Sequence, residues 1–319
     1  MLVSNNIVSN KGNIYKPYGA QIHTKSVSLP YGHNMTNICS YEAAKAQQAL
    51  LAPSISFGSI KSKALEKRIG QVVDKYSQGS NPFILGLKPG FLSKLAKKIA
   101  HSDKPVIVGI TGESACGKTT ILGNIDQTVS ELHSHEQVTS TLLGDNYYKD
   151  STHLYQKYGN FGGIMDSGYS FDSPEAVNLD KLKLDLGRLA EGKSIKTPNY
   201  DFRNGQSTPD VHEIKPSKAI IFDSIFALNP KLKESLDVGI YVETPADVIK
   251  ERWYNRTAER NVVGEAADKQ FKDVKEKAET FIHPMKKNAD IVMNGNTQQS
   301  EIQNFTKDLY DAIVGNKKN

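Results

Sequence analysis

Short apolar runs alternate with amphipathic segments from residue 102 to the end of the chain. The apolar runs, each followed by a polar turn, predict strands over residues 106–110, 138–143, 219–222, 238–242 and 291–293. Apolar residues three and four positions apart predict helices over residues 119–132, 179–189, 246–258, 267–286 and about 302–313. Strands that alternate with helices favour an α/β fold, with a mostly parallel sheet covered by helices on both faces.

The first 101 residues follow another pattern. Residues 1–60 hold few charges and many Ser, Asn, Gly and Tyr, which favours loops or weak order, and the pattern allows one short helix over residues 41–51. Apolar positions on one face predict a helix over residues 62–76. A second, basic amphipathic helix follows Pro89 and Gly90, and we expect it to cover a sheet edge rather than lie on a membrane. These features predict an N-terminal extension, 1–101, and a main domain, 102–319.

Charge differs between these two parts. The chain has a formal net charge of +5, but residues 1–101 hold 13 Lys and Arg against 3 Asp and Glu, whereas the remaining 218 residues hold 27 against 32. A basic extension fits an acidic partner. Docking on the chain's own mildly acidic body, or simple solubility, is the favoured interpretation, and a separate partner for the extension is unknown.

Composition excludes several classes of protein. At 38% hydrophobic and 24% charged residues the chain is of ordinary globular type, and its apolar runs are far shorter than the roughly 20 residues that cross a bilayer. No transmembrane segment or secretory signal is expected. Two cysteines, Cys39 and Cys116, are too few for a disulfide framework and predict a reduced, cytoplasmic protein. Aromatic residues are not interleaved with basic ones, so we expect no DNA partner.

A phosphate-binding pattern follows the first predicted strand and precedes a predicted helix. The pattern G-x-x-x-x-G-K-[ST] is filled by Gly112, Gly117, Lys118 and Thr119, and its other candidate nucleotide-binding residues are Ser114, Ala115, Cys116 and Thr120. Its glycines let backbone N–H groups face phosphate oxygens, and the helix N-terminus adds positive potential. The pattern therefore predicts a P-loop NTPase-type sheet that binds ATP or GTP. Lys118 is expected at the β and γ phosphates, and Thr119 is expected to bind Mg²⁺.

A carboxylate after the second predicted strand indicates what receives the phosphate. Asp145 follows the strand over residues 138–143, which we expect to lie beside the P-loop strand, so that Asp145 faces the γ-phosphate. There it can accept a proton from an attacking hydroxyl. This indicates a kinase; a GTPase is disfavoured because the sequence has no Asn-Lys-x-Asp run.

An ordered set of motifs extends the pattern over about residues 105–295. After the P-loop come runs that start at Asp145 (DNYYKD), Ser170 (SFDSP), Thr197 (TPNYDF), Ile221 (IFDSI), Asp237 (DVGIYVET), Glu259 (ER) and Lys287 (KNADI). In this order they resemble the uridine kinase and phosphoribulokinase family, and its uridine kinases most. The resemblance implies transfer of the γ-phosphate of ATP or GTP to a hydroxyl of a ribose-containing acceptor such as uridine or cytidine, and self-association.

The resemblance also implies residue roles at the acceptor. Asp145 matches the general base of the family, and Tyr148 matches a residue that lines the acceptor site. Asp172 matches the carboxylate that binds the ribose 2′ and 3′ hydroxyls, which suits a cis-diol because a carboxylate can accept two hydrogen bonds. Tyr200 matches the aromatic residue that borders the base, and Arg252 matches an arginine at the acceptor sugar.

Two further matches concern the phosphates. Asp223 stands where the family usually has Glu, near Mg²⁺ and Thr119, and being one methylene shorter it can act through water. Arg260 matches an arginine of a lid that closes over the transferring phosphate. A guanidinium there stabilises the charge on the equatorial oxygens, so the resemblance groups Arg260 with Asp145 and Lys118 as catalytic.

Departures from the family pattern fall in the base pocket and the lid. The histidine expected after Phe202 is replaced by Arg203, the Gly-Arg pair expected after Arg260 is replaced by Asn261 and Val262, and Asn255 stands where a second lid arginine is usual, with Arg256 beside it.

Two alternatives therefore stay open. One is a phosphoribulokinase-like enzyme, although the sequence offers only Arg203 and Lys149 as local cations for a sugar phosphate. The other is a nucleotide-binding regulatory protein with weak catalysis, which would use its basic N-terminal region to hold a partner.

Overall fold

The computed structural model describes residues 62–133, 138–259 and 262–315 of the chain. These all lie in one of the chain's two compact units, Ile55–Asn319. The helix expected over residues 41–51 and the predicted lid residue Arg260 lie outside the described residues. Among the residues that are described, every helix is too short or too polar to span a membrane.

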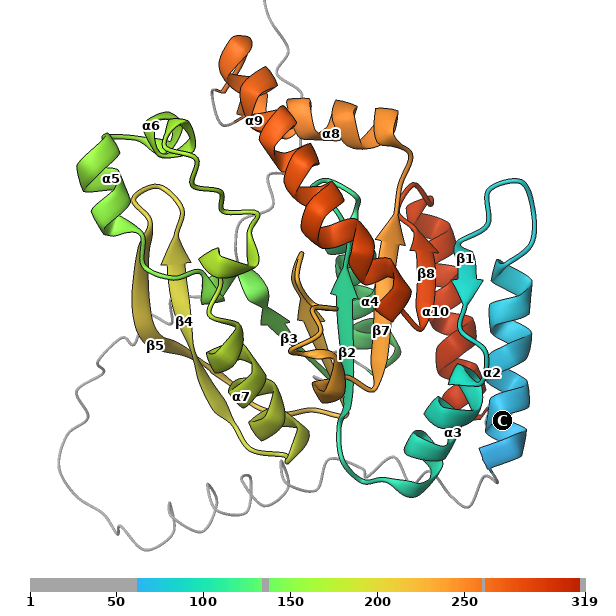
Figure 1. Ribbon diagram of the computed structural model, residues 1–319. Helices are drawn as coiled ribbons and strands as arrows, with labels where there is room; N and C mark the ends of the chain where they lie inside the picture. Colours follow the sequence, from blue (N-terminus) through green and yellow to red (C-terminus); the bar gives the residue numbers. More distant parts are fainter. Residues whose placement is uncertain (1–61, 134–137, 260–261, 316–319) are drawn as a thin grey trace, which may run out of the picture. The chain divides into compact units, whose positions relative to one another are not determined.

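A six-stranded sheet forms the centre of this unit (Figure 1). In spatial order its strands are β1 (Ile84–Leu87), β8 (Ile291–Asn294), β7 (Val238–Glu243), β2 (Val106–Thr111), β6 (Ala219–Asp223) and β3 (Thr139–Leu143). The strands from β8 to β3 pair in parallel, and β1 pairs antiparallel with β8 at the edge. The predicted α/β fold with a mostly parallel sheet is confirmed.

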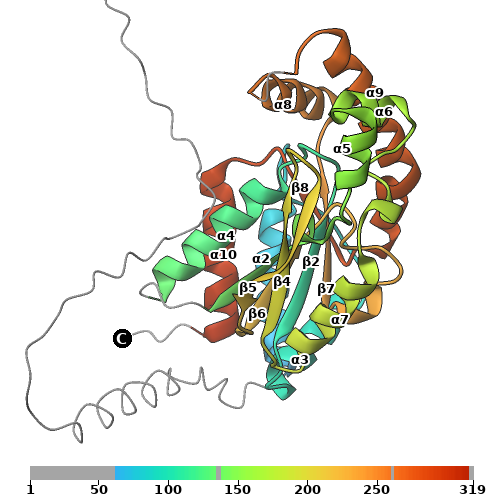
Figure 2. The same ribbon diagram turned by 90° about the vertical axis from the view of Figure 1, so that its left-hand side faces the viewer.

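Helices cover both faces of the sheet, as the patterning predicts. Helices α4 (Lys118–Leu132) and α10 (Gln299–Val314) lie on one face, and α7 (Leu179–Ala190) lies on the other (Figure 2). Strand β2 shows the cause, because successive side chains of a strand point to opposite faces. Ile107 is buried in the core that includes α7, and Ile110 is buried in the core that includes α4 and α10.

The segment before β2 belongs to this second core. Helix α2 (Ser62–Tyr76) has the predicted bounds, β1 extends the sheet, and α3 (Phe91–His101) follows the turn at Gly90. The rings of Tyr76 and Phe83 lie edge-on to Phe305 of α10, with centroids 5.3 and 5.1 Å away. The packing on α10 therefore continues N-terminal to residue 101, where the sequence predicts the start of the main domain.

Charge pairs attach the same segment to the rest of the unit. They join Lys75 to Asp308 at 2.7 Å, Lys88 to Asp290 at 3.8 Å and Lys98 to Asp237 at 3.2 Å. For residues 62–101, docking of the basic front on the acidic body is thus observed. Ion pairs that are as exposed as these each contribute little to the free energy of unfolding. Most of the stabilisation comes from burial of the apolar side chains.

The remaining elements lie beyond the sheet, on the side where its parallel strands end or next to β3 (Figure 1). They are helices α5 (Thr152–Tyr158), α6 (Phe161–Asp166), α8 (Ala246–Glu259) and α9 (Glu265–Lys277), and a separate hairpin of β4 (Ile195–Asp201) and β5 (Gln206–Ile214). The helix predicted over residues 267–286 stops being α-helical at Lys277. A π-helical turn, Ala278–Ile282, and a 3₁₀ turn, His283–Asn288, complete it, because Pro284 cannot donate a helical hydrogen bond.

Candidate active site

The loop after β2 surrounds a buried lysine. Lys118 begins α4, is 8% exposed, and donates hydrogen bonds from Nζ to the carbonyl oxygens of Gly112 and Glu113, both at 2.9 Å. Gly117 has a φ of 103° and Ala115 a φ of 67°, so the backbone turns in the left-handed region directly before the helix. Such a turn at a helix N-terminus directs N–H groups inward and makes an anion-binding cradle with a cation beside it.

A second segment packs directly against this loop. A Cβ atom on Gly295, which follows β8, would lie 1.9 Å from the carbonyl oxygen of Cys116. That carbonyl accepts a hydrogen bond from Thr244 Oγ1 at 2.7 Å. Arg252 Nη1 donates to the Gly295 carbonyl at 2.9 Å, and its Nη2 donates to Asn296 Oδ1 at 3.0 Å. Arg252 therefore lies beside the P-loop in the described contacts, and its role at the acceptor sugar stays a prediction.

Gly295→Ala is expected to disturb the P-loop, because backbone oxygen leaves no room for a methyl group. Overpacking of this kind costs roughly 1–3 kcal/mol, so we expect a lower melting temperature and more than about tenfold weaker binding of an ATP analogue by calorimetry. Gly187→Ala in α7 is the matched control, since a Cβ there meets nothing within 4 Å. Wild-type binding by the Gly295 variant would contradict the packing argument.

Two oxygen ligands lie side by side at the start of α4 and the end of β6. Thr119 Oγ1 donates to Asp223 Oδ2 at 3.4 Å. Burial, together with the charge of Asp145, raises the pKa of Asp223, and Lys118 opposes the shift. In the described part of the chain no three His, Cys, Asp or Glu residues gather as a metal site. One hydroxyl and one carboxylate nevertheless fit Mg²⁺, which takes most of its ligands from phosphates and water.

Asp145 lies one strand farther from the P-loop than predicted. Strand β3 pairs with β6, and β6 lies between β3 and the P-loop strand β2. The turn after β3 still closes over the end of β6, because a Cβ atom on Gly144 would be 2.4 Å from Ser224 Cβ. As a result, the exposed Asp145 carboxylate acts electrostatically on both Asp223 and Asp172.

An aromatic cluster forms one wall of the site. The ring of Tyr148 lies 5.3 Å from Tyr200, 5.3 Å from Phe202 and 6.2 Å from Phe171. The hydroxyl groups of Tyr200 and Ser151 are hydrogen-bonded at 2.6 Å, and burial raises the pKa of Tyr200 to about 12. Phe202 remains 49% exposed and so presents a free ring surface to solvent. The two phenylalanines were not predicted as site residues. Both belong to quoted motifs, since Phe171 directly precedes Asp172 and Phe202 ends the run that contains Tyr200.

Asp172 is the next residue after Phe171 of this aromatic cluster, and the charge of the P-loop lysine acts on it. Burial raises the pKa of Asp172 to about 6, the charges of Asp273 and Asp145 add to the rise, and those of Arg256 and Lys118 oppose it. In the structure, the charges of Asp145 and Lys118 are close enough to Asp172 to shift its pKa. The spacing of the three motifs in the sequence could not have established this proximity.

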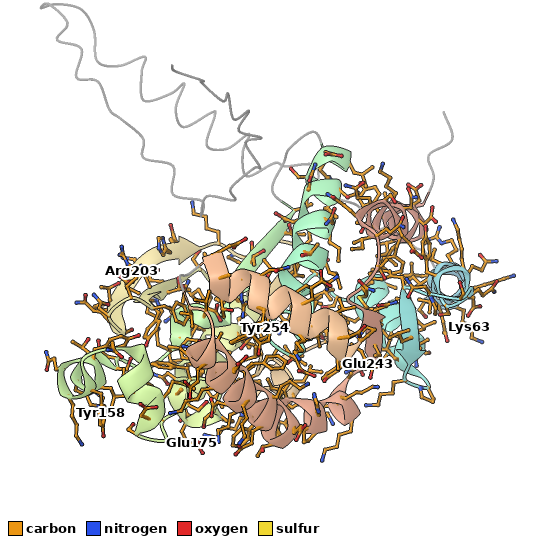
Figure 3. The ribbon with its side chains drawn as sticks, turned by 90° about the horizontal axis from the view of Figure 1, so that it is seen from above. Lys63, Tyr158, Glu175, Arg203, Glu243 and Tyr254 are labelled. Atoms are coloured by element: carbon orange, nitrogen blue, oxygen red, sulfur yellow. The ribbon has the colours of Figure 1, made fainter. Side chains whose placement is uncertain are left out.

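Helices α8 and α9 lie side by side (Figure 3), and side chains from both form hydrogen bonds with the P-loop. From α8, Arg256 Nη2 donates to Ser114 Oγ at 2.6 Å. From α9, Lys275 Nζ donates to Glu113 Oε2 at 2.8 Å. His283 begins the 3₁₀ turn farther along the chain, and its Nε2 lies 2.6 Å from Glu113 Oε1. Glu113, Lys275 and His283 were not predicted as site residues, because Glu113 is 162 and 170 residues away in sequence from its two partners.

Comparison with known proteins agrees with this geometry. The Phosphoribulokinase / Uridine kinase family matches residues 107–300. The chain belongs to this family. A protein from Staphylococcus epidermidis called uridine kinase is 35% identical over 215 residues, which are 66% of this chain and 98% of that protein. A uridine kinase from Chlamydia pneumoniae is 32% identical over 206 residues, 63% of this chain and 86% of that protein. The resemblance predicted from the ordered motifs is confirmed.

Proposed function

We propose that this kinase transfers the γ-phosphate of ATP to a hydroxyl of a nucleoside, with uridine or cytidine as acceptor. The observation that carries the proposal is that the charges of the P-loop lysine, Lys118, and of Asp145 both act on Asp172, and that an aromatic cluster around Tyr148 lies beside Asp172. The names of the similar proteins from two organisms support the nucleoside acceptor.

Each group has a chemical task in this proposal. Lys118 and the loop amides bind the β and γ phosphates, and Asp145 takes the proton from the attacking hydroxyl. Asp172 accepts hydrogen bonds from two ribose hydroxyls, while the Tyr148 and Tyr200 rings border the base. Arg260 is proposed, from the resemblance alone, to close over the transferring phosphate.

Thr119 and Asp223 are the residues that we propose to hold Mg²⁺. Their two oxygens provide the hard ligands that this ion prefers. When bound, the ion supplies positive charge to the phosphate oxygens of the donor, which lowers the cost of bringing an electron-rich acceptor oxygen near them.

A sugar phosphate is a poorer acceptor for this site. Arg203, one of two cations considered for such a phosphate, is 90% exposed, bonded to Asp201 of its own hairpin at 2.7 Å, and located at the edge of the molecule (Figure 3). The other, Lys149, is exposed as well. The alternative of a regulator with weak catalysis draws no support from a site that retains both carboxylates.

Acceptor profiling tests the proposal. ADP release with ATP and Mg²⁺ is measured for uridine, cytidine, adenosine, guanosine and ribulose 5-phosphate, and the product is identified by mass spectrometry. We expect turnover with the pyrimidine nucleosides. Turnover with the sugar phosphate alone, or ATP hydrolysis that no acceptor accelerates, would overturn the proposal.

The cytoplasm is the compartment that we propose for this enzyme. The thiol of Cys116 is free and buried, and burial raises its pKa, so it stays protonated inside the P-loop. A reducing compartment suits a free thiol beside the donor phosphates. Self-association stays a prediction, and a partner for the basic N-terminal region, 1–101, is unknown.

A further inference from the structure

We propose that Asp273 of α9 is a specificity-determining residue, which pairs with Asp172 and makes the acceptor site select ribosides that carry no phosphate. The proposal deepens the proposed function and rests on it, since it concerns the same acceptor site. Asp273 belongs to none of the motifs from which that function was predicted.

A shared serine holds the two acidic residues together. Ser170 Oγ donates a hydrogen bond to Asp273 Oδ2 at 2.8 Å, and the same Oγ accepts one from the backbone N–H of Asp172 at 3.3 Å. Ser170 thus connects α9 to the segment that carries Asp172. Repulsion between the two carboxylates is the largest effect of any charged neighbour on the pKa of Asp172.

The cations near Asp172 and Asp273 are hydrogen-bonded to the donor loop. Lys118 bonds to the carbonyl oxygens of Gly112 and Glu113, and Arg256 bonds to Ser114, so both cations are held by atoms of the donor loop. Lys275, two residues from Asp273, bonds to Glu113 of the same loop.

Two carboxylates act on a third one at the proposed acceptor site. The charges of Asp273 and Asp145 both act on Asp172, and Arg203, one of the two cations considered for an acceptor phosphate, is bonded to Asp201 of its own hairpin. A phosphate on the sugar diol would face two like charges, whereas hydroxyl groups would meet two hydrogen-bond acceptors.

The pair also sets the pH range in which the acceptor binds. The groups that face Asp172 are Asp273 from α9, Arg256 from α8, Lys118 from α4, Asp145 from the turn after β3, and the neutral Tyr148 phenol. With a pKa of about 6, Asp172 is ionised above that pH and loses its charge below it. Riboside binding therefore weakens as the pH falls through 6, and removal of the Asp273 charge moves this limb to lower pH.

Asp273→Asn tests the proposal, because the amide oxygen can still accept from Ser170 while the charge is gone. The probes are uridine and uridine 3′-monophosphate, which has a free 5′ hydroxyl and a phosphate at the diol. We expect the Kd ratio of the phosphorylated to the plain nucleoside to fall several-fold, and the acid limb of kcat/KM for uridine to move to lower pH by roughly half a unit to one unit. Glu276→Gln, which removes an exposed charge from the same helix, should change neither quantity.

The outcomes separate this proposal from the proposed function. Carbon-13 NMR titration of the Asp172 carboxyl in the wild type and in Asp273→Asn needs no turnover, and a lower pKa in the variant supports the pair. An unchanged Asp172 pKa with an unchanged Kd ratio overturns the proposal even if uridine is phosphorylated. If the wild type phosphorylates no nucleoside, the proposed function fails, and the selectivity argued here fails with it. Should Asp273→Asn not fold, Asp273→Ser provides the same charge removal.

Discussion

Replacing Asp145 by Asn is expected to lower kcat with uridine by roughly 10²- to 10⁴-fold, the range typical of a lost general base. The amide cannot take a proton from the attacking hydroxyl, although it has nearly the shape of the carboxylate. ATP affinity should change little, because the substitution leaves every residue of the P-loop in place and keeps nearly the size of the side chain at position 145.

Rapid-quench measurement of the phosphoryl-transfer step, with calorimetric titration of an ATP analogue, checks both halves of this prediction. Asp180→Asn is the control, because that carboxylate lies at the start of α7 and is 85% exposed. A variant of Asp145 that retains wild-type kcat would remove the general-base role, and one that no longer binds the analogue would show that the residue instead supports the donor site.

Replacing Lys118 by Ala should reduce kcat by roughly 10²- to 10³-fold, as expected when one preorganised donor is taken from a developing anion. The loss has two physical sources. The ammonium no longer offsets the charge of the β and γ phosphates, and the carbonyl oxygens of Gly112 and Glu113, to which Nζ is bonded at 2.9 Å, lose their partner inside the loop. We therefore expect weaker ATP binding as well as slower transfer.

Single-turnover kinetics at saturating ATP separate these two effects, and circular dichroism establishes that the variant is folded. Lys233→Ala removes an exposed lysine on the surface and should behave as the wild type. Unchanged single-turnover rates in the Lys118 variant would place the phosphates elsewhere in the molecule.

Much of the fold could be predicted because its elements carry local signals. The parallel strands are buried on both faces and so appear as short apolar runs, and α2 shows one apolar face per turn. Strand β1 was missed because it has four residues and a glycine, and the β4–β5 hairpin was missed because its strands are largely polar. The helix after Ala267 ends earlier than its apolar pattern predicts, because Pro284 interrupts the helical hydrogen bonds beyond Lys277.

In the candidate site, too, the features with a local sequence signal could be predicted, and those that depend on distant contacts could not. The P-loop could be predicted because its function requires fixed residue types at fixed local spacing. The position of Asp145 was predicted one strand too close, since strand order depends on how loops of different length cross the sheet. The bond of Arg252 to the Gly295 carbonyl could not be predicted, because the two residues are 43 positions apart in sequence.

By itself, therefore, the sequence determined the parallel α/β architecture, the family and the phosphate-binding loop, because periodicity and motif spacing are local properties of the chain. Only the tertiary structure decided which distant groups meet: Gly295 on the Cys116 carbonyl, Lys275 on Glu113, and Asp273 on Ser170. Such contacts link residues 100 or more positions apart. The sequence does not show whether a charged residue or a glycine has a contact partner from a distant part of the chain. Only the folded structure shows which residue that partner is.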